Sequence, residues 1–296
     1  MEILTIVLSG LLSLVSGGGI VLDSIAKSQI RSQVISLEQQ AIRVDNVPSY
    51  QIAQGKLQKV RIATRGLTIE PAFKIAVLEL ETDAIEFDIA KLNLSSLEGL
   101  RNSLKQPLQG TGKLVLTQTD LNQALQSPEI LAQLQQALNR LIVSKAGSSN
   151  IAYQLLKLEV QLKSENRLGV KLKLARQPTD HQQDNSLKTA KNSPTEELTL
   201  VLGFKIQVLN GKSIEITEPQ GSVNNRPMSS RILNGFAQGI SDRLDLTSLE
   251  TNGILARILQ LEINQEQLKL VGFAQVATKA PQLSSKEIKV TQFAKL

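Results

Sequence analysis

The sequence alternates apolar and polar residues in many short runs, and this period of two constrains the fold more than any other feature. In the clearest runs, 156–162 and 198–208, every second residue is Leu, Val, Ile or Phe. Successive side chains of a strand point to opposite faces, so such runs predict strands with one buried face and one wetted face. Shorter stretches of the same kind lie at 56–69, 75–89 and 114–116. We therefore expect several long strands.

Turn signals join these runs into antiparallel hairpins. Polar residues at 164–167 separate 156–162 from a second alternating run at 170–174. Asn210-Gly211, the preferred two-residue turn, separates 198–208 from the apolar positions after it. A last hairpin is predicted around Gln265-Glu266.

Helices are predicted between the strand runs. Ser127-Pro128-Glu129 combines a capping serine, a proline at the first helical position and an acid in the first turn, and Gly147 ends that helix. Thr119 is expected to cap a turn before it. Helices are also predicted over 227–244 and 253–259. Strands and helices do not alternate regularly, which favours an α+β fold over a parallel sheet.

Residues 3–22 carry no charge, and about 20 helical residues reach roughly 30 Å, the thickness of the bilayer's hydrocarbon core. An apolar stripe at spacings of three and four continues from Leu22 to Ala41 and predicts an amphipathic helix. Three interpretations of the apolar segment stay open: a retained anchor, a cleaved signal peptide and an interfacial helix. Lys27 and Arg31 favour a cytoplasmic body for a retained anchor.

Composition removes many kinds of chemistry. The chain has no Cys and one His, so disulfides, thiolate or multi-histidine metal sites and Cys–His catalysis are excluded. No nucleophile elbow or phosphate loop occurs, and we expect no cofactor, no metal and no enzymatic activity. The net charge of +6 suits anionic surfaces, but only 3% of residues are aromatic, so nucleic acid is not an expected partner.

Two groups of acids keep a hydrolase hypothesis open, because a glycosidase-like mechanism needs only two carboxylates. The groups are Asp83, Glu86 and Asp88, and Asp242, Asp245 and Glu250. Solvated surface is the more common role for such residues.

Several short blocks, in a fixed order, carry a family resemblance. They include Val44-Asp45-Asn46-Val47-Pro48, Thr119-Asp120-Leu121-Asn122, Phe236-Ala237-Gln238-Gly239-Ile240 and Gly253-Ile254-Leu255-Ala256-Arg257. Together they resemble the LmeA-like phospholipid-binding family, a former domain of unknown function, and are closest to its cyanobacterial branch. The resemblance implies a protein of the cell envelope that binds phospholipid, with an elongated, curved antiparallel sheet around helical elements. It implies no enzymatic activity.

These observations predict three parts. Residues 1–40 form an N-terminal membrane-anchor or amphipathic helix, 41–276 form the LmeA-like lipid-binding domain, and 277–296 form a polar tail. Within the domain, the polar stretch 177–197 is expected to be a flexible insertion.

The predicted function is to hold the acyl chains of a phospholipid in an apolar groove. Burial of each CH₂ group contributes about 0.8 kcal/mol, so a chain of a dozen or more methylenes drives binding without polar contacts. The expected partners are phospholipid and the membrane, and the sequence names no protein partner. Arg61 and Arg65 are the candidates for head-group contact. The candidates for the groove wall are Phe87, Ile89, Leu114, Leu116, Phe204, Ile206 and Phe236. A filled core, in a membrane-tethered structural or adaptor protein, fits the same alternation and stays open.

Overall fold

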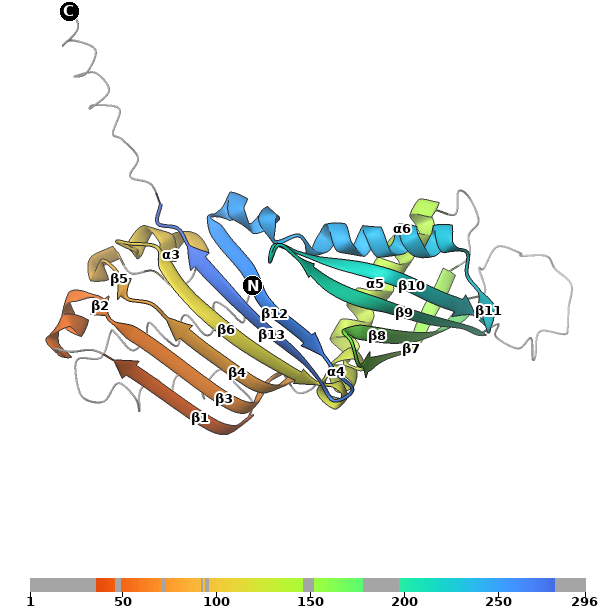
Figure 1. Ribbon diagram of the computed structural model, residues 1–296, viewed down its shortest axis with the longest axis horizontal. Helices are drawn as coiled ribbons and strands as arrows, with labels where there is room; N and C mark the ends of the chain where they lie inside the picture. Colours follow the sequence, from red (N-terminus) through yellow and green to blue (C-terminus); the bar gives the residue numbers. More distant parts are fainter. Residues whose placement is uncertain are drawn as a thin grey trace, which may run out of the picture.

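A computed structural model describes residues 36–45, 49–70, 73–91, 93, 96–145, 152–177 and 197–279. Two antiparallel sheets lie end to end and make the molecule elongated (Figure 1). Helices lie against both sheets, so the predicted α+β class is confirmed. The strands form two large sheets, not one.

The six-stranded sheet has the order β1-β3-β4-β6-β13-β12, and all of its neighbouring strands are antiparallel. The C-terminal hairpin thus pairs with β6, a strand far away in the sequence. The strands are β1 (Ser36–Asp45), β3 (Lys59–Glu70), β4 (Phe73–Thr82), β6 (Leu108–Thr117), β12 (Ile254–Ile263) and β13 (Gln267–Val276). A two-stranded sheet of β2 (Lys56–Leu57) and β5 (Ile85–Glu86) accompanies them.

The five-stranded sheet has the order β11-β10-β9-β8-β7 and confirms two predicted hairpins. Asn166 closes the first hairpin and Asn210-Gly211 the second, all three with φ between 52° and 67°, the left-handed region that tight hairpin turns require. The strands are β7 (Ala152–Lys163), β8 (Arg167–Gln177), β9 (Glu197–Leu209), β10 (Ser213–Val223) and β11 (Arg226–Pro227).

Among the described helices, α5 (Pro128–Lys145) begins where its signals predict. The Ser127 hydroxyl accepts a hydrogen bond from the Ile130 amide at 3.3 Å. The others are α3 (Leu97–Ser103), α4 (Gln118–Leu125), α6 (Ser230–Ser241) and the 3₁₀ turns η1 (Ser49–Gln54), η2 (Ile89–Lys91), η3 (Asp242–Leu244) and η4 (Leu246–Asn252).

Four local predictions are wrong. The amphipathic helix does not reach Ala41, because 36–45 is strand β1 and pairs with β3. Residues 254–259 are strand, since Gly253, at φ 73°, ends η4 and does not begin a helix. The N-cap of α4, the helix before α5, is Thr117 and not Thr119, because the Thr117 hydroxyl accepts from the Asp120 amide at 3.1 Å. The alternation at 85–89 is not one strand, because Ile89 lies in η2.

No helix in the described part of the chain is long and apolar enough to cross a membrane. The predicted apolar helix at 3–22 lies outside the described residues. So do 178–196 of the predicted insertion and 280–296 of the predicted tail.

Hairpin tips join the two sheets. The Asn166 side-chain oxygen accepts from the Ile263 amide and the Gly211 carbonyl accepts from the Ile258 amide, both at 2.7 Å. Ile258 and Ile263 belong to β12, the outer strand of the six-stranded sheet. The turns of the five-stranded sheet therefore occupy this edge and fix the two sheets end to end.

Candidate functional site

Each large sheet has one strongly apolar face. Directly paired residues of antiparallel strands lie on the same face. In the six-stranded sheet this pairing aligns Leu78, Leu114, Leu270 and Leu261 across four strands. In the five-stranded sheet it places Leu172 and Leu200 in one row beside Leu158, and Val170 and Leu202 in the next row beside Val160.

Helix α6 covers one side of the five-stranded sheet's apolar face by packing on β10. A Cβ atom on Gly221 would lie 2.8 Å from Leu202 Cδ2 and 2.9 Å from Leu233 Cδ2, so glycine is what permits this close approach. Leu233 and Ala237 are the buried residues of the helix. The Ser241 hydroxyl accepts from the Ile216 amide at 2.9 Å and fastens the helix end to the same strand.

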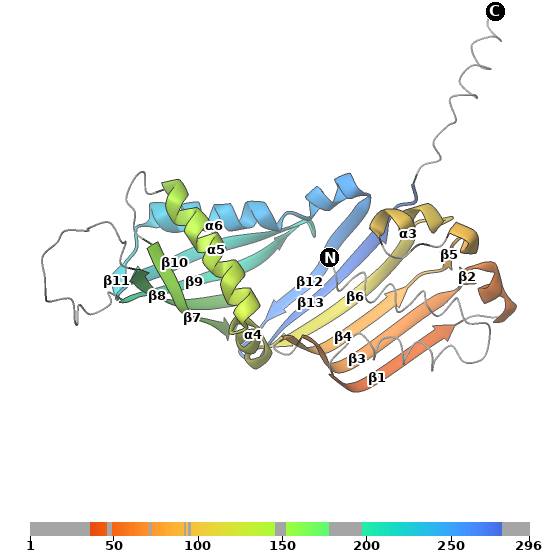
Figure 2. The same ribbon diagram turned by 180° about the vertical axis from the view of Figure 1, so that it is seen from behind.

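The other side is closed by α4 and α5, which lie along the free edge of β7 (Figure 2). Asn122 accepts from the Val160 amide at 2.7 Å and donates to the Val160 carbonyl at 2.8 Å, as a neighbouring strand would. Three glutamines also bond the backbone of this strand. Gln118 accepts from the Leu162 amide at 2.8 Å, and Gln126 donates to the Leu158 carbonyl at 2.5 Å. Gln135 accepts from the Leu155 amide and donates to the Tyr153 carbonyl, both at 2.6 Å. The sequence-based prediction missed this role, although amides at 118, 122 and 126 recur every four residues, the spacing of one helix face.

The two helix covers leave the middle strands less protected. On the apolar face of β8 and β9, several side chains are only half-buried, although Leu174 and Leu202 beside them are buried. We call this half-buried set the β8–β9 surface; it consists of Val170, Leu172, Leu200, Phe204 and Ile206.

The structure does not bring the seven predicted wall residues together. Leu114 and Leu116 pack against the buried cluster of Leu67, Ile75 and Leu78 in the six-stranded sheet. Phe204 and Ile206 belong to the β8–β9 surface of the other sheet, and Phe236, on α6, is 38% exposed.

Phe87 and Ile89, the other two predicted wall residues, have different surroundings from these five. Phe87 is 1% exposed and forms a bridge with Leu104, at the end of α3, so it belongs to the packed core. Ile89 is 45% exposed on a 3₁₀ turn. The alternation that suggested a common wall is interrupted between them.

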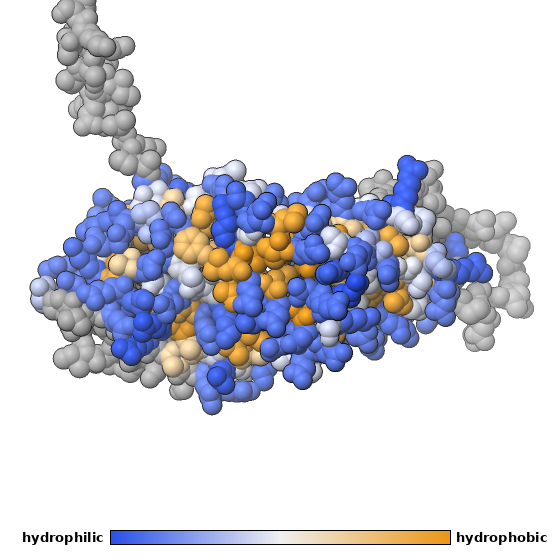
Figure 3. Space-filling view, in the orientation of Figure 1, coloured by the Kyte–Doolittle hydropathy of each residue, from blue (hydrophilic) through white to orange (hydrophobic). Residues whose placement is uncertain are grey.

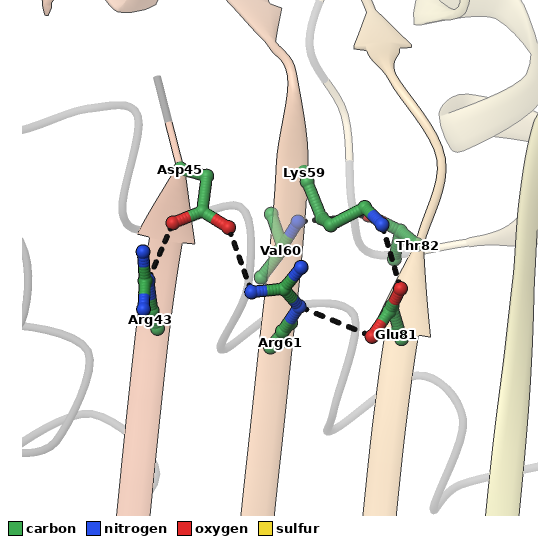
Figure 4. Close-up of polar contacts among 7 residues, drawn as sticks. All are labelled: Arg43, Asp45, Lys59, Val60, Arg61, Glu81 and Thr82. Carbon is green, nitrogen blue, oxygen red and sulfur yellow. Dashed lines mark hydrogen bonds and ion pairs between the residues drawn. The ribbon is translucent and has the colours of Figure 1, made fainter. Parts of the chain in front are cut away.

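The predicted head-group residues lie on the opposite, polar face of the six-stranded sheet. Arg61 alternates with buried Ile62 and is held between two carboxylates, Asp45 at 3.0 Å and Glu81 at 3.1 Å (Figure 4). Lys59 also binds Glu81, at 2.7 Å, and this hydrogen bond lowers the pKa of Glu81 from its ordinary value. Arg65 is exposed on the same strand. The geometry separates both arginines from the apolar face.

Charged residues line two open grooves in the described part of the chain. One, of about 510 Å³, lies on the polar face beside Arg43, Arg61, Glu79 and Lys113. The other, of about 580 Å³, lies where the sheets meet, and Gln118, Lys163, Arg167 and Gln265 are among its lining residues.

The acidic residues that kept a hydrolase open have separate structural partners. Asp88 pairs with Lys91 at 3.3 Å, Glu250 pairs with Arg257 at 2.9 Å, and Asp245 accepts from the Thr247 amide at 2.8 Å. No group of His, Asp or Glu in the described residues could hold a metal ion.

Amphipathic antiparallel sheets with a partly uncovered aliphatic surface define a class of α+β protein suited to an apolar ligand. The family model described as LmeA-like phospholipid-binding matches residues 15–273, nearly the whole chain. The chain therefore belongs to this family, and the resemblance seen in the sequence is confirmed. Its ligand class is phospholipid. No match is found among the curated proteins.

Proposed function

We propose that this protein is a membrane-associated, non-catalytic lipid-binding protein that holds phospholipid acyl chains on the β8–β9 surface. The observation that carries the proposal is the half-burial of Leu172, Leu200 and Phe204 between two helices that cover the flanking strands. A completed core would bury such side chains. An acyl chain laid over them would complete the cover.

The energetics support an aliphatic ligand. Each buried CH₂ group contributes about 0.8 kcal/mol before ordering costs, so even part of one acyl chain offsets those costs. The exposed side chains of Ile232 and Phe236 offer more apolar area beside this surface, because they flank the stripe by which α6 packs on β10. The bound acyl chain would then run along α6.

Membrane association follows from the apolar segment at 3–22, which we propose tethers the protein to a membrane of the cell envelope. Such a tether keeps a lipid-holding domain close to its ligand. One such binding surface can serve to carry, present or sense a phospholipid.

The second candidate is a tethered structural or adaptor protein with a filled core. The burial of Val60 and Ile75 favours it for part of the six-stranded sheet. Leu114, Leu116 and Leu270 on the apolar face of that sheet are half-buried, so the filled core is complete only around Val60 and Ile75.

The decisive experiment is mass spectrometry of organic extracts from the full chain after removal of detergent. We expect phospholipid in stoichiometric amount. Leu200→Gln, on the β8–β9 surface, should lose the lipid, and Thr199→Gln, the next residue on the opposite face, should retain it. Leu200→Trp provides a second test, because it keeps the surface apolar but occupies the space of a chain.

Circular dichroism and thermal unfolding would show that each variant folds. Wild-type protein without stoichiometric lipid would refute the proposal in favour of the adaptor. Equal lipid in all four proteins would remove the β8–β9 surface as the binding site.

A further inference from the structure

On the polar face of the five-stranded sheet, the hairpin of β7 and β8 has more basic than acidic residues. Alternation and pairing place Lys157 and Lys163 of β7 and Arg167, Lys171 and Lys173 of β8 on this face, together with the single acid Glu159. Lys205 of β9 continues the row that starts with Lys163 and Arg167. The other acids on this side are Glu197, paired with Ala175, Glu215, paired with Gln207, and Glu218, which binds Arg167.

Among the described residues, two of these cations have an ion-pair partner and four have none. Lys157 pairs with Glu159, and Arg167 pairs with Glu218. Lys163, Lys171, Lys173 and Lys205 make no ion pair with another described residue. The positive field is also felt by Glu159, whose pKa is lowered first by its hydrogen bond with Lys157 and further by Lys171 and Lys173.

Exposed aliphatic side chains lie on the same face, one of them beside a lysine. Val201 pairs directly with Lys171 across β8 and β9 and is 40% exposed, and Leu209, on the same face of β9, is 43% exposed. Figure 3 shows this face as mainly hydrophilic, with scattered apolar spots over the five-stranded sheet and a larger apolar area over the neighbouring sheet. Half-buried Val271 and Phe273 of β13 lie on the polar face of the six-stranded sheet, the face opposite Leu270.

We propose that this lysine face docks the protein onto the surface of an anionic membrane, with Lys163, Lys171, Lys173 and Lys205 at the lipid phosphates and Val201 and Leu209 reaching the acyl boundary. Cations and exposed aliphatics on one face match a bilayer interface, where charge and apolar contact act together. α5 and α6 lie on the other face, so docking leaves the β8–β9 surface away from the bilayer contact. The docking surface presupposes the lipid-holding function proposed above, but the two are measured separately.

The test is co-sedimentation of the full chain with vesicles of phosphatidylcholine alone or mixed with phosphatidylglycerol. The segment at 3–22 can bind any bilayer, so the informative quantity is the ratio of binding to anionic and to neutral vesicles. Lys171→Glu with Lys173→Glu should lower this ratio at least tenfold, because each basic residue near an anionic surface strengthens binding severalfold. At about 1 M salt, where the Debye length is about 3 Å, the wild-type ratio should approach one.

Lys91→Glu with Lys105→Glu is the matched control. It makes the same change in net charge on the six-stranded sheet's side of the molecule, with loss of the exposed Lys91–Asp88 ion pair, and should keep the ratio. Equal loss in both double variants would show that net charge alone acts and would overturn the proposal, as would no loss in either. A DNA duplex that displaces the protein from anionic vesicles at equal phosphate concentration would overturn it in favour of a nucleic-acid surface.

Val201→Ser tests the apolar part of the docking surface and should weaken anionic-vesicle binding severalfold. Thr199→Ser, on the same face, is its control. Lipid extraction separates docking from holding. The Lys171→Glu, Lys173→Glu protein should still carry phospholipid, and Leu200→Gln should lose the lipid but keep the vesicle ratio.

Discussion

Asn122 of α4 gives Val160 of β7 both hydrogen bonds that a neighbouring strand would supply, at 2.7 and 2.8 Å. An exposed edge strand is a template for pairing with other chains. Here the amide side chains of α4 and α5 occupy that edge, and they also fasten these helices beside the β8–β9 surface. The helices are held by polar side chains that can exchange with water, which suits a cover over a ligand surface.

Replacement of Asn122 by Ala should therefore destabilise the protein. Two backbone groups of half-buried Val160 lose their partners, which costs about 1–3 kcal/mol in the free energy of unfolding. Urea unfolding followed by circular dichroism measures the change. Gln123→Ala, one residue along on the exposed side of the helix, is the control and should change stability by less than about 0.5 kcal/mol. Equal stability of the two variants would contradict the strand-like role of Asn122.

A methyl group on Gly221 should disturb the contact between α6 and β10. Gly221→Ala places Cβ within 3 Å of Leu202 and Leu233, an overpacking that costs about 1–3 kcal/mol. Gly203→Ala is the matched control, because its Cβ would meet nothing within 4 Å. Thermal unfolding should give a lower Tm for Gly221→Ala than for Gly203→Ala. The reverse order would show that α6 does not pack on β10 in this way.

Substitution of Phe87 should destabilise the protein as at a core position, and substitution of Ile89 should have the small effect of a surface position. Phe87→Ala removes a fully buried ring and is expected to cost about 3–5 kcal/mol, whereas Ile89→Ala, at an exposed position, should cost well below about 1 kcal/mol. Guanidinium unfolding measures both. If Phe87→Ala loses bound phospholipid without loss of stability, Phe87 is a wall residue after all.

The ion pairs around Glu81 should make stability depend on pH in the acid range. Hydrogen bonds from Lys59 and Arg61 lower the pKa of Glu81 in the folded protein from its ordinary value of 4.5. The stability that this carboxylate contributes is therefore present above pH 4.5 and is lost as the pH falls through the lowered pKa. Thermal unfolding from neutral to acid pH at low salt should show a smaller decrease for Glu81→Gln than for the wild type. Identical decreases would show that solvent screens this pair completely.

Local signals sufficed for much of this fold. Asn210-Gly211 specifies its turn because few residues adopt positive φ, and Ser127-Pro128 starts α5 because its cap lies within one turn of the chain. The faces of β8 and β9, and of β7 from Leu158 on, follow from the two-residue period, whereas Leu156 lies at an irregularity of β7 and is exposed. These features depend on neighbours in sequence, which is why sequence alone could establish them, along with family membership.

The remaining features depended on partners far away in sequence. Residues 36–41 fit a helical stripe, and only pairing with β3 makes them strand. β12 is strand because β13 lies beside it, and β13 in turn lies between it and β6. Phe87 became core and Arg61 became part of an ion-pair network through contacts with other elements. The amino-acid sequence by itself determined which residues alternate and where the chain turns. Tertiary structure decided which apolar faces are covered and which stay partly open, because cover comes from helices that no local pattern positions.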